Sequence, residues 1–193
     1  MVPFFPESIQ SVDLSILEWI QTHLVSPFCD GFFSFITHLG DSGILWILIA
    51  VAMLFFKKTR KTGLMMGAAL VLGLILGNGV LKNLFQRVRP YDLENALVQV
   101  PLIAKPGDWS FPSGHTLASF EAATVLMIRD KRFGIPALIL ACLIAFSRLY
   151  LYVHFPSDVL AGAILGIFFG FLGVLIVGKI AKAVEKELKK IEK

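Results

Sequence analysis

Residues 154–178 read HFPSDVLAGAILGIFFGFLGVLIVG, in which a histidine and an aspartate stand directly before a long apolar run. Val159–Gly178 has no charged side chain and matches the roughly 20 residues that an α-helix needs to cross a bilayer. Gly162, Gly166 and Gly170 recur four residues apart, a spacing that lets helix backbones approach closely in lipid. The stretch therefore predicts a membrane-spanning helix, and packing within one bundle is favoured over dimerisation.

Four more apolar runs repeat this pattern along the chain: Ser42–Phe56, Gly63–Leu81, Thr116–Ile128 and Phe133–Phe146. Of the 193 residues, 56% are hydrophobic and only 17% are charged, and the mean hydropathy is +0.75. Soluble domains normally carry about 25% charged residues. The sequence thus predicts an all-α fold, a polytopic transmembrane helix bundle of five or six spans, in a single domain that covers residues 1–193.

Residues 1–40 are predicted to form N-terminal interfacial helices beside the bundle. An apolar stripe recurs at helical spacing within residues 8–25: Val12, Ile16, Trp19 or Ile20, and Leu24. Asp13 and Glu18 are expected to keep the other face in water, as in a helix that lies on a membrane surface. In an alternative that stays open, part of residues 12–39 dips into or crosses the bilayer.

The position of the basic residues accounts for the net charge of +4 without a nucleic-acid partner. The first 56 residues contain no Lys or Arg, and basic clusters then occur at residues 57–61, at 129–132 and from Lys179 onward. If all five runs cross, these clusters share one side, which the positive-inside rule assigns to the cytoplasm. We therefore expect a multi-pass protein of the cell (plasma or inner) membrane, with a catalytic bundle at 41–178, a basic cytoplasmic tail at 179–193 and a site on the extracytoplasmic side.

Ionisable side chains collect at the outer ends of these runs, where they are costly to bury and usually functional. Lys82 ends the second run, and Arg89 follows seven residues later, with Pro90 expected to stop the helix. The string PSGH at residues 112–115 precedes the third run. Ser113 is a good N-cap there, and the first N–H groups of the helix can bind an anion. Alone this string is a weak signal, because ordinary turns before helices contain the same residues.

The string from Ser147 to Asp158 is more informative. Arg148 ends the fourth run and offers a planar guanidinium that suits phosphate oxygens. His154 and Asp158 stand four residues apart, so Asp158 can accept from one ring nitrogen of His154 and leave the other free as a nucleophile. A capping aspartate beside a spectator histidine is the alternative.

Three strings thus follow one another: Lys82 to Pro90, PSGH at residues 112–115, and Ser147 to Asp158. In this order and spacing, they resemble the signature of the type 2 phosphatidic acid phosphatase superfamily over about residues 40–178. The resemblance implies a metal-independent phosphatase that acts on lipid phosphates, with a helical core shared with vanadium haloperoxidases and bacterial acid phosphatases. It implies that His154 is the nucleophile that forms a phosphohistidine, that Asp158 orients it, and that His115 is the general acid. The residues implied to hold the phosphate are Lys82, Arg89, Ser113, Gly114 and Arg148.

The chemistry of these residues agrees with that assignment. Three fixed cations and a helix N-terminus can stabilise the charge of a phosphoryl group, a task that metals often perform. Asp158 is the only acid within the strings, so we expect neither a metal nor another cofactor. Because His154 must be neutral to attack and His115 protonated to donate, we expect a bell-shaped pH dependence. Glu121, inside the third run, is expected to be protonated, hydrogen-bonded within the bundle or part of a substrate cavity, with a structural role favoured.

The expected partners are a lipid phosphate substrate and the membrane lipids, and the oligomeric state stays open. By the resemblance, undecaprenyl pyrophosphate is the first expected substrate, phosphatidylglycerol phosphate the second and phosphatidic acid the third. A lipid phosphotransferase, which passes the phosphate to a lipid or sugar acceptor, is a second hypothesis. A non-catalytic transporter of anionic lipids is a third. Cys29 and Cys142 are expected to remain unpaired.

Overall fold

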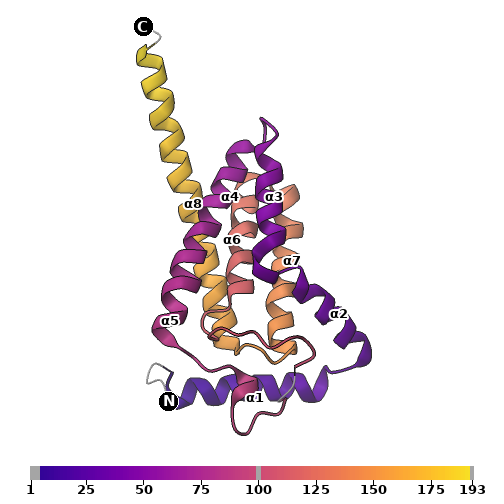
Figure 1. Cartoon of the computed structure of the whole chain (residues 1–193). Coiled ribbons are helices and arrows are strands. Elements are labelled where there is room, and N and C mark those ends of the chain that lie inside the picture. Colours follow the sequence, from indigo (N-terminus) through magenta and orange to yellow (C-terminus); the bar gives the residue numbers. More distant parts are fainter. Residues whose placement is uncertain (1–4, 99–100, 192–193) are drawn as a thin grey trace.

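The computed structural model describes residues 5–98 and 101–191, and all regular elements in these ranges are helical (Figure 1). The N-terminal half contains α1 (Glu7–His23), α2 (Pro27–His38), the short 3₁₀ helix η1 (Asp41–Gly43), α3 (Ile44–Leu54) and α4 (Arg60–Leu72). The π-helix η2 (Gly73–Leu81) continues α4 into α5 (Lys82–Phe85), and the 3₁₀ helix η3 (Pro90–Asp92) follows. The remaining helices are α6 (Gly114–Arg129), α7 (Lys131–Tyr150) and α8 (Pro156–Ile191).

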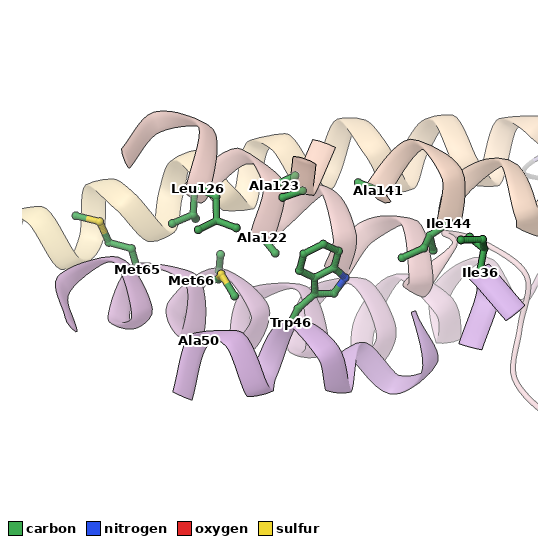
Figure 2. Close-up of a cluster of buried hydrophobic side chains, with 13 residues drawn as sticks. Ile36, Trp46, Ala50, Met65, Met66, Ala122, Ala123, Leu126, Ala141 and Ile144 are labelled. Carbon is green, nitrogen blue, oxygen red and sulfur yellow. The ribbon is translucent and has the colours of Figure 1, made fainter. Parts of the chain in front are cut away.

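The long helices form a bundle in which α6 packs against both α7 and α8, and α4 packs against α3 and α8. The core between them is apolar and includes Trp46, Met66 and Ile144 (Figure 2). The indole Nε1 of Trp46 donates a hydrogen bond of 3.0 Å to the hydroxyl of Ser119. The one polar atom of this large buried side chain is therefore satisfied inside the bundle.

The three regularly spaced glycines of α8 allow it to lie directly against α6. A Cβ atom added at Gly162 would lie 2.8 Å from the carbonyl oxygen of Ser113, and one at Gly166 would lie 2.6 Å from that of Leu117. At Gly170 it would lie 2.7 Å from the Cβ atom of Thr124. The predicted use of these glycines, close helix packing within one bundle, is confirmed.

Four helical segments of the described chain are long and apolar enough to cross a membrane: Pro27–Leu54, Arg60–Asp92, Lys131–Tyr150 and Pro156–Ile191. The 16-residue α6 is shorter, but it lies inside the bundle between α7 and α8. The first candidate span begins at Pro27 rather than at Ser42, because α2 leads through η1 into α3. Positive φ angles at Ser42 (51°) and Gly43 (65°) mark the bend between them. The length and composition of Pro27–Leu54 thus fit the alternative in which part of residues 12–39 enters the bilayer.

The helix α1 lies across the end of the bundle that is opposite the C-terminus of α8 (Figure 1). Its exposed face carries Val12, Ile16 and Trp19, as suits an interfacial helix. The expectation that Asp13 faces water is wrong, because Asp13 is only 3% exposed. Helical spacing separates two faces of α1 but does not tell which one packs on the protein, and Asp13 is buried against the guanidinium of Arg87.

The two ends of the bundle carry different parts of the sequence. The α3–α4 turn, the α6–α7 turn and the C-terminal part of α8 lie at one end, whereas α1 and the connection from α5 to α6 lie at the other (Figure 1). The basic clusters and the three strings therefore lie at opposite ends, as the sequence predicts. Cys29 and Cys142 are both free.

The helix that follows Lys82 ends earlier than expected. The sequence places the stop at Pro90, but α5 ends at Phe85, where Gln86 adopts a left-handed conformation with φ of 44°. Pro90 instead begins η3. After Gln86 the chain leaves the helix, Arg89 is extended, and the side chains of Arg87 and Arg89 are both buried.

Candidate active site

A cavity of about 800 Å³ extends from the end of the bundle near α1 along α3 and α4. Six of the eight predicted site residues line it: Lys82, Arg89, Gly114, His115, Arg148 and His154. They come from α5, the connection before η3, the start of α6, the end of α7 and the loop between α7 and α8. Five separate segments thus contribute to one cavity.

His154 lies at the centre of this group and is 1% exposed. Its Nδ1 atom is 3.4 Å from Oδ2 of Asp158, and its Nε2 atom is 3.1 Å from the guanidinium Nη1 of Arg89. Burial lowers the pKa of His154 well below its ordinary value of 6.5, and the cations Arg89 and Arg148 lower it further. The ring is therefore neutral near pH 7, with one nitrogen toward a carboxylate and the other toward the cations.

Asp158 lies behind His154 and does not line the cavity. Its Oδ2 atom accepts hydrogen bonds from the hydroxyl of Ser110 (2.5 Å) and the backbone N–H of Phe155 (3.0 Å). Its Oδ1 atom accepts from Nη1 of Arg87 at 2.6 Å. Each carboxylate oxygen thus has at least one donor, which fixes the group that faces Nδ1 of His154.

Lys82 and Arg89 are joined by the carboxylate of Asp108, which the sequence analysis missed. Nζ of Lys82 donates to Oδ2 of Asp108 at 2.5 Å, and Nη2 of Arg89 donates to Oδ1 at 2.6 Å. Burial acts to raise the pKa of Asp108, but the two cations outweigh it and hold the pKa below its usual range. The side chain of Asp108 is 56% exposed, whereas both cations are buried. The two predicted phosphate ligands therefore already hold an anionic group between them.

Arg148 closes the cavity from the side of α7. Its Nη1 atom donates to the hydroxyl of Thr37 in α2. Its buried Nε atom has no hydrogen-bond partner within the described residues. An unsatisfied buried donor on a cation is costly, so this N–H is well suited to an anionic ligand.

His115 and Ser113 occupy different environments although they are close in sequence. Nε2 of His115 lies 2.9 Å from Oδ1 of Asp41, a partner that the sequence analysis did not identify. Ser113 is at the N-cap position of α6, as predicted, but its side chain makes no capping hydrogen bond. Its hydroxyl accepts from Oγ1 of Thr116 at 3.0 Å, and the residue does not line the cavity. Only His115 and Gly114 of this string thus face the candidate site.

The remainder of the cavity is mostly apolar and runs between α3, α4 and η2, lined by Ile47, Val51, Leu64 and Leu74. Glu121 also lines it and is 1% exposed, with an Oε1 atom that has no hydrogen-bond partner within residues 5–98 and 101–191. A Cβ atom at Gly73 would lie 2.0 Å from that oxygen, so this glycine makes room for the carboxyl group. The wall of a cavity is thus one of the positions expected for Glu121 that the structure shows.

No group of three or more His, Cys, Asp or Glu side chains that could hold a metal ion occurs in the part of the chain that the structure describes. Sequence reasoning did not identify Asp13, Asp41, Arg87, Asp108 or Ser110 as members of the candidate site. All five lie outside the three strings or between their defining positions. The local signal for Asp108 and Ser110 is their place just before PSGH, whereas Asp13 carries none.

The chain is also similar to known proteins. Residues 62–182 match the PAP2 superfamily. Over 148 residues the chain is 37% identical to an undecaprenyl-diphosphatase of Sulfolobus acidocaldarius, covering 76% of this chain and 70% of that protein.

Two solved structures are also similar. The crystal structure of a transmembrane PAP2 type phosphatidylglycerolphosphate phosphatase from Bacillus subtilis superposes with a TM-score of 0.74 and 33% identity, over 91% of this chain and 89% of that one. The crystal structure of Aquifex aeolicus LpxE superposes with a TM-score of 0.73 and 30% identity, over 90% and 99%. On the family match, the fold and the filled signature, the chain belongs to the PAP2 superfamily.

Proposed function

We propose that this membrane phosphatase removes the terminal phosphate from a lipid pyrophosphate, undecaprenyl pyrophosphate above all, without a metal and through a phosphohistidine on His154. The observation that carries the proposal is the meeting of Lys82, Arg89 and Arg148 around the neutral ring of His154 in one cavity. Fixed cations placed where phosphoryl charge develops are an effective means of stabilising the transition state.

In the proposed first step, the lone pair on Nε2 of His154 attacks phosphorus. The bond between phosphorus and the bridging oxygen breaks, and the leaving lipid phosphate takes a proton from His115. Water then attacks the phosphohistidine, with His115 accepting its proton, and the phosphorus–nitrogen bond breaks. Orthophosphate leaves, and neutral His154 is restored. Asp158 stabilises the charge on the imidazole ring through Nδ1 while phosphorus is attached to Nε2.

The apolar part of the cavity supports a lipid substrate. It continues from the cationic end into the membrane-spanning part of the bundle, so a phosphate at the cations would leave the hydrocarbon chain among Ile47, Val51 and Leu64. The similarity to the undecaprenyl-diphosphatase supports an isoprenoid diphosphate as the first choice.

Phosphatidylglycerol phosphate is the second candidate substrate. The similarity to the phosphatidylglycerolphosphate phosphatase covers nine-tenths of both chains and favours it over phosphatidic acid. Both candidate lipids lie in the cell membrane, where we propose that the site opens on the extracytoplasmic side.

Phosphate release by the purified protein from a panel of these lipids, in the presence of a chelator, tests the proposal. We expect release to persist in the chelator and to be lost in His154→Ala. Loss of release on chelation would overturn the metal-free reaction, and release by His154→Ala would overturn the nucleophile. Phosphorylated lipid or sugar acceptor in place of free phosphate would identify a phosphotransferase instead. Lipid transport unchanged by His154→Ala, without phosphate release by the wild type, would identify a transporter.

A further inference from the structure

We infer that Arg87, which is held by Asp13 of α1, is a positioning residue for His154. Through Asp13, α1 then helps to orient the proposed nucleophile. The inference rests on the proposed function, since it assigns the residues that orient the proposed nucleophile. Arg87 lies outside the defining positions of the three strings, and it does not line the cavity.

Arg87 bridges two buried carboxylates that come from opposite ends of the sequence. Its Nη1 atom donates to Oδ1 of Asp158 at 2.6 Å, and its Nη2 atom donates to Oδ2 of Asp13 at 2.7 Å. The central carbon of the guanidinium, Cζ, lies 3.9 Å from the ring centroid of Phe155 and 4.0 Å from that of Phe5. Arg87 is thus held by two ion pairs and by contacts with two aromatic rings.

Asp13 also holds the start of α8. Its Oδ1 atom accepts from the backbone N–H of Ser157 at 2.9 Å, and its Oδ2 atom accepts from the Ser157 hydroxyl at 2.5 Å. A carboxylate at a helix N-terminus is stabilised by the free N–H groups there. The Asp13 side chain therefore holds both Arg87, which binds Asp158, and Ser157, which precedes Asp158 in α8.

The charges of this group favour a dedicated role. Asp13 is 3%, Arg87 5% and Asp158 0% exposed, so three charged groups share a site from which water is excluded. Burying charges is costly even when they are paired, and such a site adds little stability compared with apolar packing. An arrangement of this kind is useful when it fixes a group whose orientation matters. Here the group is the carboxylate that faces Nδ1 of His154 at 3.4 Å.

The backbone of Arg87 ties the same unit together. Its carbonyl oxygen accepts from the N–H of Ser110 at 2.8 Å, and the Ser110 hydroxyl reaches Oδ2 of Asp158 at 2.5 Å. Arg87 thus fixes one oxygen of Asp158 directly and the other through Ser110. The charged and titratable groups that face His154 are Lys82, Arg89, His115, Arg148 and Asp158.

Two substitutions are expected to move the titration of His154 in opposite directions. Arg87→Gln leaves the negative charge of Asp158 uncompensated, which stabilises the imidazolium form and raises the pKa of His154. Asp13→Asn leaves Arg87 with one carboxylate fewer, which adds net positive charge near the ring and lowers the pKa of His154 further. A purely structural role would lower activity without shifting this pKa in two directions.

The experiment measures kcat, KM, the pH–rate profile and the NMR titration of the His154 ring in the full-length protein in detergent micelles. We expect kcat to fall about 100-fold in Arg87→Gln, because small misplacements of reacting groups have effects of that size, with KM nearly unchanged. The kcat of Arg87→Lys should lie between those of Arg87→Gln and the wild type, since an ammonium cannot bridge both carboxylates in the same plane. Ser157→Ala removes one hydrogen bond of Asp13 and one of Arg87 but no charge, so it should have a smaller effect than Asp13→Asn.

Matched controls separate the catalytic unit from general stability. Asp30→Asn removes a carboxylate of α2 that accepts from the hydroxyl of Tyr150 at 2.6 Å and does not contact Asp158. Arg129→Gln removes an arginine at the opposite end of the bundle. Both should keep the wild-type kcat and His154 titration. Thermal unfolding in the same detergent shows which variants are folded.

Several outcomes would overturn the inference. Equal losses of kcat in Asp13→Asn and Asp30→Asn would do so, as would an unshifted His154 titration in folded Arg87→Gln and Asp13→Asn. If Arg87→Gln does not fold, Asp13→Asn decides through the same titration. Failure of the proposed function is distinguishable, because wild-type protein would then release no phosphate while the NMR titration would still report whether Arg87 and Asp13 act on His154.

Discussion

At the scale of single residues, the two nitrogens of His154 meet different groups. Nδ1 faces Asp158 at 3.4 Å, whereas Nε2 lies 3.1 Å from Arg89 on the side of the cavity. Because Nε2 lies beside a permanent cation, its protonation is disfavoured, so the nitrogen stays available for attack. The same cation can then hold an oxygen of the phosphoryl group that the nitrogen receives.

The burial of His154 sets the acid limb of the pH–rate profile. Its pKa lies well below 6.5, so the neutral, nucleophilic form predominates at neutral pH and activity should fall only when the pH drops through that lowered pKa. We expect full activity at pH 6.5 on this limb, and a loss of about 10⁴-fold in His154→Ala at every pH. Initial rates of phosphate release between pH 4 and 9 check both points. An acid limb centred above pH 6.5 would contradict the assignment of this limb to His154.

Asp108 forms ion pairs with the two cations that we propose to bind phosphate. Its lowered pKa keeps it charged at neutral pH, so it must compete with an anionic ligand for Lys82 and Arg89. Asp108→Asn should therefore tighten inhibition by orthophosphate about tenfold, the equivalent of roughly 1.4 kcal/mol. Competition assays at several phosphate concentrations measure this change. Weaker inhibition in Asp108→Asn would show that Asp108 instead holds the two cations in their binding positions.

At the scale of elements, the contact between α6 and α8 positions the whole site. Ser113 and Leu117 of α6 present backbone carbonyls to Gly162 and Gly166 of α8. In addition, the N–H of Ser113 donates to the carbonyl of Asp158 at 3.1 Å, so the starts of the two helices are joined. A shift of α6 relative to α8 would therefore move His115 and Asp158 relative to each other.

Gly166→Ala tests this contact. Its new methyl group would lie 2.6 Å from the carbonyl oxygen of Leu117 and 2.7 Å from Cβ of Phe120, so the helices must separate. We expect a destabilisation of about 1–3 kcal/mol, measured as a lower Tm in detergent, together with a loss of activity. Gly178→Ala on the same helix is the matched control, because nothing lies within 4 Å of its added Cβ atom. Equal Tm changes in the two variants would show that the close approach of α6 and α8 is unimportant.

The sequence was sufficient for features that depend on neighbouring residues. The length of each apolar run predicted the helices, and the fixed spacing of His154 and Asp158 predicted their contact. It was insufficient where distant segments meet. Helical spacing alone could not show that Asp13 packs on Arg87 rather than facing water, and no pattern links Asp108 to Lys82. Pro90 was expected to stop α5, but a left-handed residue, Gln86, does so first.

At the scale of the whole molecule, the bundle has a basic end and a site end (Figure 1). The site end holds α1 and the connection between α5 and α6, whose cations are paired with acids or line the cavity. The basic end holds the α3–α4 turn, where Lys57, Lys58 and Lys61 are exposed. This asymmetry predicts orientation in the membrane, because exposed basic residues near span ends stay in the cytoplasm.

Labelling of single cysteines in intact cells tests that orientation. Starting from a Cys29→Ser, Cys142→Ser background, Lys58→Cys marks the α3–α4 turn and Glu94→Cys marks the connection at the site end, both at exposed positions. A membrane-impermeant maleimide should label Glu94→Cys in intact cells and Lys58→Cys only after the cells are permeabilised. The reverse pattern would place the cavity mouth in the cytoplasm. Because the cations, His154 and α1 share one end of the bundle, the accessibility of residue 94 also determines from which side a phosphate can reach the site and to which side it is released.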